Sequence, residues 1–154
     1  MNRLRRNSAL LQKTISVLLI MLLIYAHAYA DSARDIQLNL PRMYSGIFYW
    51  LNNKGLQSVT IEIKSVEINR SGIIEARGKG VYQIPGNVTN IDIYIQIDSA
   101  SLSFEMWEDN PDSDSFTTSG SHQGSIAQDL KTIKAKWIKK DTGHEGVLEL
   151  FAKE

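Results

Sequence analysis

From Arg42 onward, apolar and polar residues alternate along the chain, which is the pattern of β-strands that bury one face. The alternating segments are short, rich in β-branched and aromatic residues, and separated by the turn-forming residues Gly, Asn, Asp and Pro. This part of the chain shows no extended helical periodicity, so the predicted fold class is all-β. We predict eight strands, at 44–51, 56–68, 72–83, 90–98, 101–108, 116–124, 132–140 and 146–152.

Short connections between these segments predict that strands adjacent in sequence pair antiparallel. Such strands must bury one face and protect their edges, and closure into an eight-stranded up-and-down barrel does both. A β-sandwich of two sheets is the alternative. We expect one barrel domain over residues 42–154, preceded by a lead-in segment over 31–41 that is prone to fraying.

Two of the predicted connections are longer than the others. Residues 109–115 (DNPDSDS) are acidic and polar, which predicts a mobile, solvated loop. Ser125 and Gln128 have the spacing of a helix-capping box, and Ile126 and Leu130 lie four positions apart. We therefore expect one short helical turn near 126–130, with its apolar side folded over one end of the barrel.

The inward rows of the strands decide whether the barrel is filled. In segment 56–68 the apolar residues change phase, which predicts a β-bulge near Lys64 and Ser65. The inward row of segment 72–83 contains three small residues in succession, which leave room in the interior. Large aromatic residues fill that room, or it remains as a pocket. The small residues are Ala76, Gly78 and Gly80, and the aromatic candidates are Tyr44, Phe48 and Trp50.

The run Tyr44–Trp50 (YSGIFYW), followed by a hairpin and the Gly-rich segment Ala76–Gly80 (ARGKG), resembles the opening of avidin- or lipocalin-like up-and-down barrels. In those families a Gly-x-Trp element lies near the start of the first strand, and Phe48 takes the place of that Trp here. The resemblance is architectural and implies a barrel with one end that opens. It implies no particular binding residue.

The N-terminus has the layout of a secretory signal peptide over residues 1–30. Met1–Lys13 is basic, Ile15–Tyr25 is an apolar run, and Ala28–Ala30 is a small-x-small cleavage site. A membrane-spanning helix needs roughly 20 apolar residues, more than this run contains. We therefore expect an exported protein, periplasmic or extracellular, with no stable membrane insertion.

Charge and cysteine content narrow the function classes further. The chain has 154 residues, 17 Lys and Arg against 17 Asp and Glu, and no Cys. Four cationic residues and no acidic ones lie in the leader, so the exported domain is acidic, which argues against nucleic-acid binding. The lack of Cys excludes disulfides, thiol nucleophiles and Cys-based metal sites, and favours a bacterial periplasm. No cofactor motif is present, so we expect no cofactor.

Strand direction predicts a ligand-binding site framed by residues from four strands. Trp50, Tyr82 and Glu108 lie at the C-terminal ends of the first, third and fifth strands, which share one mouth of an up-and-down barrel. His122 lies on the strand that runs back from this mouth, and we expect it deeper or nearer the far end. No catalytic residue is predicted, because the inward row of His122 offers no nucleophile.

Three other features are candidates for contacts outside the barrel. Trp107 is predicted to face outward, where it would contact a partner or a sugar unless the lead-in or the short helical turn covers it. The carboxylates near 109–115 lack the spacing of a calcium loop, so no metal site is predicted. His144 is predicted to be solvated in the last loop.

Three function classes remain open. The first is an exported β-barrel module that holds a small apolar or amphipathic ligand. The second is a periplasmic or secreted interaction or inhibitor protein that acts through its outer surface and loops. The third, an enzyme, has the least support because no acid–base pair or cofactor motif is evident.

Overall fold

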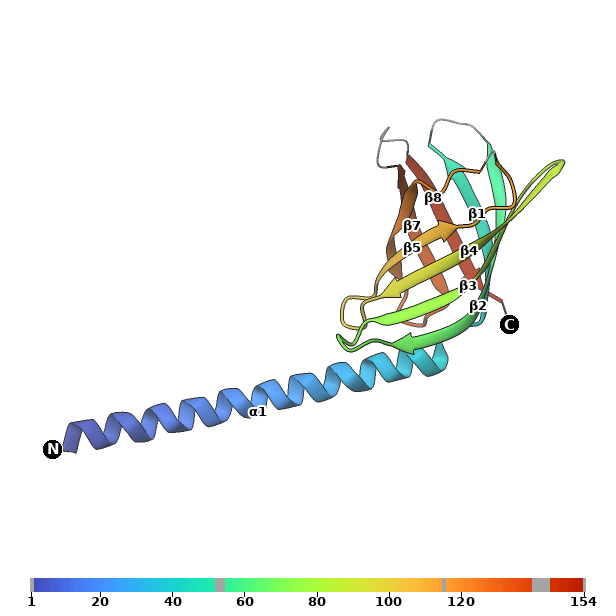
Figure 1. Cartoon of the computed structure of the whole chain (residues 1–154). Coiled ribbons are helices and arrows are strands. Elements are labelled where there is room, and N and C mark those ends of the chain that lie inside the picture. Colours follow the sequence, from blue (N-terminus) through green and yellow to red (C-terminus); the bar gives the residue numbers. More distant parts are fainter. Residues whose placement is uncertain (1, 52–54, 115, 140–144, 154) are drawn as a thin grey trace.

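The computed structural model describes residues 2–51, 55–114, 116–139 and 145–153. Eight antiparallel strands close into a single barrel in chain order, with β8 returning to pair with β1 (Figure 1). The up-and-down barrel is therefore confirmed, and the sandwich alternative is wrong. The strands are β1 (Met43–Trp50), β2 (Leu56–Ile68), β3 (Ile74–Ile84), β4 (Asn87–Ile97), β5 (Ser103–Asp109), β6 (Gly120–Ile126), β7 (Thr132–Lys139) and β8 (Glu145–Ala152).

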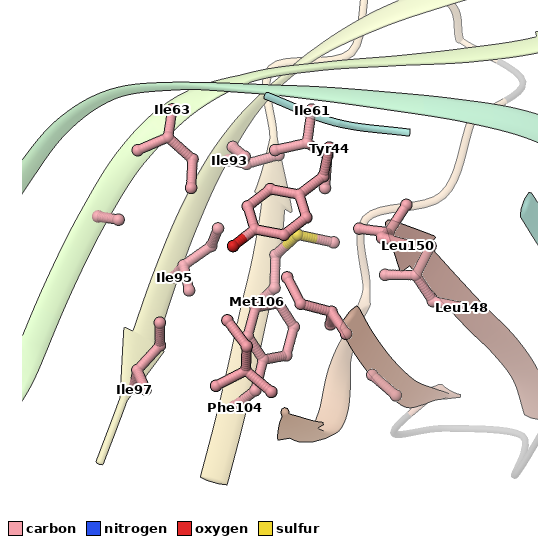
Figure 2. Packing of buried hydrophobic residues seen from close by; sticks show 14 of the residues in the cluster. Tyr44, Ile61, Ile63, Ile93, Ile95, Ile97, Phe104, Met106, Leu148 and Leu150 are labelled. Carbon is pink, nitrogen blue, oxygen red and sulfur yellow. The ribbon is translucent and has the colours of Figure 1, made fainter. Parts of the chain in front are cut away.

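The inward rows form a dry core in the half of the barrel away from the mouth. Figure 2 shows Tyr44 among isoleucines of β2 and β4 and leucines of β8. The Tyr44 hydroxyl donates a hydrogen bond to the Leu130 carbonyl oxygen at 2.6 Å, which satisfies both buried groups. Burial, and then the negative charge of Asp129, raises the pKa of Tyr44 above its ordinary value, so the hydroxyl stays a donor.

The predicted bulge in β2 is present. The β2–β3 register shifts between Ile63 and Ser65, because β2 contains one extra residue there. This extra residue changes which side chains of β2 face the core. Beside it on β3, a Cβ on Gly78 would collide with the backbone carbonyl oxygen of Glu62. Gly78 therefore allows close strand approach, whereas Gly80 makes room for the side chains of Ile91 and Ile93 on β4 rather than for the aromatic residues of β1.

β6 begins at Gly120, four residues later than predicted, because the preceding segment is used to cross the mouth. The mobility of loop 109–115 stays a prediction, but Asp112 in this loop is bonded to β4. The backbone N–H and side-chain amide of Asn90 both donate to the Asp112 carboxylate, at 2.8 and 2.6 Å. These bonds lower the pKa of Asp112 below its ordinary value and tie the loop to β4.

A helix closes the barrel end opposite the mouth, but it is not the one predicted. Helix α1 (Asn2–Asn39) runs beneath the barrel, and its C-terminal part carries Ala33, Ile36 and the following Leu40 into the core (Figure 1). Residues 31–39 are thus helical and packed rather than frayed. Near 126–130 the chain makes a turn closed by the Leu130 N–H and the Ala127 carbonyl oxygen, and not a helical turn. Leu130 adopts a positive φ of 59°, which ends any helix there.

The N-terminal part of α1 extends away from the barrel (Figure 1). Its apolar side chains over Ile15–Tyr25 are exposed. By length and composition, the stretch Thr14–Asn39 is apolar enough to cross a membrane, and signal sequences near the N-terminus share this property. The leader is therefore compatible with a signal peptide.

Candidate functional site: a polar and aromatic cavity at the barrel mouth

A cavity of about 170 Å³ lies inside the mouth end of the barrel. Its deep wall is buried, whereas Trp50, Gln57, Phe116 and Thr117 are only partly buried and connect the cavity to solvent. Because α1 covers the other end of the barrel, this cavity opens to solvent at the mouth. The lining residues are Phe48, Trp50, Gln57, Tyr82, Glu108, Phe116, Thr117, His122 and Trp137.

Aromatic rings make up most of the cavity wall. Trp50 packs edge-to-face against Phe48 and against Trp137, with ring centroids 5.0 and 5.1 Å apart. Two glycines give these rings their space, because a Cβ on Gly146 would meet the Phe48 ring and one on Gly120 would meet Trp137. The aromatic wall is therefore a packed assembly with little freedom to collapse into the cavity.

A hydrogen-bonded group of three polar side chains completes the wall. Glu108 follows Phe104 and Met106 in the inward row of β5, so strand alternation carries its carboxylate into the barrel. The Tyr82 hydroxyl donates to Glu108 Oε1, and His122 Nε2 lies 3.1 Å from the same oxygen. The side chains of His122 and Glu108 are only 1% and 3% exposed. We call Tyr82, Glu108 and His122 the mouth triad.

The geometry of the mouth triad assigns its protons. The Tyr82 hydroxyl has one proton to donate, and this proton points to Glu108 Oε1. The 3.4 Å contact between Tyr82 Oη and His122 Nε2 is therefore secondary. Nε2 needs a proton to bond the carboxylate, so Nε2 is the protonated ring nitrogen. Burial raises the pKa of Tyr82 well above its ordinary value, and the charge of Glu108 and its hydrogen bond raise it further.

All four residues predicted to frame the site line this one cavity: Trp50, Tyr82, Glu108 and His122. The prediction for His122 is confirmed in its first form, deeper, because His122 is buried whereas Phe116 and Thr118 are only partly buried; the alternative, toward the far end, is wrong. Because β6 starts late, His122 is only its third residue, and it pairs with Met106 next to the mouth. Their role in ligand binding stays a prediction.

Sequence reasoning missed Gln57, Thr117 and Trp137 as lining residues. Trp137 alternates with polar residues in step with Ile133 and Ala135, and this alternation was the available signal for its inward orientation. It pairs with Gly146 at the mouth end of β7 and β8. Gln57 lies beside Phe48 in the β1–β2 ladder, and Thr117 belongs to the segment that was predicted as strand. No local pattern marks these two polar residues as lining the cavity.

Trp107 lies on the outer surface, partly buried against Tyr94, with ring centroids 5.5 Å apart. The Arg77 guanidinium lies over the Tyr94 ring, 4.8 Å from its centroid. Register explains the stack, since Arg77 pairs with Tyr94 and Tyr94 with Trp107 across β3, β4 and β5. An outer groove of about 500 Å³ runs beside it toward Asp92 and Asn110.

Within the described part of the chain, no group of three or more His, Asp or Glu side chains is arranged to hold a metal ion. His144, which was predicted to be solvated, lies outside the described residues. After β5, the Asp112 carboxylate is bound to Asn90, and the Asn110 amide donates to Asp92 of β4, which also pairs with Lys79.

No protein-family model matches the chain, and a search of curated proteins finds no match. The site is therefore interpreted from its own geometry.

Proposed function

We propose that this protein is an exported β-barrel binding module that holds a small amphipathic ligand at the barrel mouth. The observation that carries the proposal is a single cavity, open at one end, where aromatic rings surround a buried polar group. Binding sites of this kind combine an apolar wall with a few fixed polar groups that orient the ligand. The leader, compatible with a signal peptide, supports export.

The volume of the cavity limits what it holds. At about 170 Å³, it is close to an engineered cavity of roughly 150 Å³ that binds benzene and smaller than the ~300–1,000 Å³ of typical ligand pockets. A ligand the size of a substituted benzene ring would fill it. A fatty acid would leave most of its chain outside, so a small aromatic or short amphipathic compound fits better.

Tryptophan fluorescence tests the proposal, because Trp50 and Trp137 line the cavity and Trp107 does not. Titration of the exported protein with benzyl alcohol, benzylamine and benzoate should give a saturable change with at least one compound. Trp50→Phe should reduce the amplitude of this change, whereas the matched variant Trp107→Phe should retain it. Absence of a saturable response to all three compounds, confirmed by calorimetry, would contradict the proposal.

The outer groove beside Trp107 supports a second candidate, a protein or sugar contact on the outer surface. The favouring observation is that this groove has an aromatic wall, Tyr94 and Trp107, facing polar side chains of Asp92 and Asn110. Trp107→Ala should then weaken binding of the exported protein to an oligosaccharide array. An unchanged array signal, or no signal for the parent protein, would reject a sugar contact.

A further inference from the structure

We propose that the ligand of the mouth cavity is a protonated amine, held by Glu108 and by the aromatic wall. This inference rests on the proposed function, because it names the chemical class of ligand for the same cavity. The apolar part of such a ligand would lie among the aromatic rings, and its ammonium group would lie beside the mouth triad.

The charge inside the cavity is the first argument. His122 Nδ1 is buried and has no hydrogen-bond partner among the described residues. A cationic imidazole would leave its Nδ1 proton buried without an acceptor, which is far more costly than an unpaired lone pair on the neutral ring. This environment favours a neutral imidazole that donates to Glu108 through Nε2.

Two donors converge on one oxygen of Glu108, the Tyr82 hydroxyl and His122 Nε2–H, and both favour the ionised carboxylate. The lining includes Glu108 and, among the described residues, no Lys or Arg. An ionised Glu108 thus gives the cavity a negative charge that no Lys or Arg among the described lining residues offsets. A buried charge without an opposite charge is unfavourable, and a cationic ligand would remove that cost.

The free oxygen of Glu108 is the second argument. Both hydrogen bonds that the described residues make to this carboxylate end on Oε1. Oε2 remains available to accept from a ligand, and an ammonium N–H is the donor that gives the strongest such bond. An anionic ligand would be repelled by the same group.

The aromatic wall is the third argument. Phe48, Trp50, Tyr82, Phe116 and Trp137 all line the cavity. A space of about 170 Å³ keeps any occupant near these rings, and a cation within ~6 Å of a ring centroid is attracted by the ring's electron density. The aromatic rings and the Glu108 carboxylate therefore both favour a cationic ligand.

A charge series on one ring tests the inference. Benzylamine, benzyl alcohol and benzoate share a phenyl group and are cationic, neutral and anionic at neutral pH. We expect benzylamine to bind the exported protein at least about tenfold more tightly than benzyl alcohol, and benzoate to bind weakest. Equal affinity for the amine and the alcohol, or tighter binding of benzoate, would overturn the inference while leaving the proposed function intact.

Two variants locate the preference. Glu108→Gln should remove the preference for the amine and leave benzyl alcohol binding within about twofold, which also shows that the variant is folded. Asp109→Asn is the matched control, because it removes one carboxylate from the adjacent, exposed position and should keep the preference. A preference that survives Glu108→Gln would contradict the role of Glu108; if this variant does not fold, the charge series on the parent protein decides.

Discussion

Gly78 shows how one residue sets the curvature of this barrel. It pairs with Ile63 next to the β2 bulge, where the two backbones come closer than a side chain allows. Gly46 and Gly124 make the same kind of approach to the backbone of a neighbouring strand. Sharp bends at glycines and bulges are how a twisted sheet turns the corners of a small barrel.

We predict that Gly78→Val destabilises the protein by about 1–3 kcal/mol, because the new Cβ must push the Glu62 carbonyl away and distort the β2–β3 ladder. Denaturant unfolding of the exported protein measures this change. Gln83→Val is the control, since it adds a β-branched residue at an exposed position of the same strand and should change stability by less than about 0.5 kcal/mol. An unchanged unfolding midpoint for Gly78→Val would show that the strands separate there at little cost.

The C-terminal part of α1 covers the barrel end opposite the mouth. Ala33, Ile36 and Leu40 face the core, whereas Leu38 is 71% exposed. Polar side chains fasten the same segment: Ser32 Oγ donates to the Ser99 carbonyl oxygen at 3.0 Å, and Gln37 Nε2 donates to the Val66 carbonyl oxygen at 3.1 Å. With this end covered, the mouth cavity becomes the accessible part of the interior.

Replacing the buried leucine of this segment should therefore cost far more than replacing the exposed one. Leu40→Ala leaves a void between the segment and the core, and we expect a loss of about 2–5 kcal/mol. Leu38→Ala should cost less than about 0.5 kcal/mol. Guanidinium unfolding of both exported variants gives the comparison. Similar losses for the two variants would mean that the segment does not pack on the barrel in solution.

At the scale of the whole molecule, α1 runs without a break through Ala30, the end of the predicted signal peptide. Tyr29, on the leader side, contacts Gly72, while the residues that cover the barrel end begin at Ser32. Removal of residues 1–30 would thus remove the Tyr29 contact and retain the residues that cover the barrel end. The helix thus combines a leader that is compatible with a signal peptide and a C-terminal part that covers the barrel end.

We predict cleavage after Ala30, so that the exported protein begins with Asp31. Signal peptidases require small side chains at this site, and Ala28 and Ala30 supply them. Mass spectrometry of the N-terminal peptide from exported protein checks the site, and Ala30→Glu should cause the uncleaved precursor to accumulate. Recovery of the full-length chain in the cytosol would contradict export.

Much of the barrel could be predicted from local patterns. Side-chain alternation is a property of a few consecutive residues, so it was sufficient for the strand number, the inward rows and the change of phase at the β2 bulge. Strand direction then placed Trp50, Tyr82 and Glu108 at one mouth, because successive antiparallel strands must alternate in direction. These inferences required no knowledge of distances between strands.

The contacts that give the site its chemistry depend on long-range packing instead. His122 reaches Glu108 because the β5–β6 register pairs it with Met106, two residues before Glu108 in the inward row of β5. The covering role of residues 31–40 likewise has no strand or turn signature, since it requires an assembled barrel end on which to pack. Local sequence specifies which face of a strand is buried, whereas the register and spacing between distant segments arise only when their combined packing is optimised.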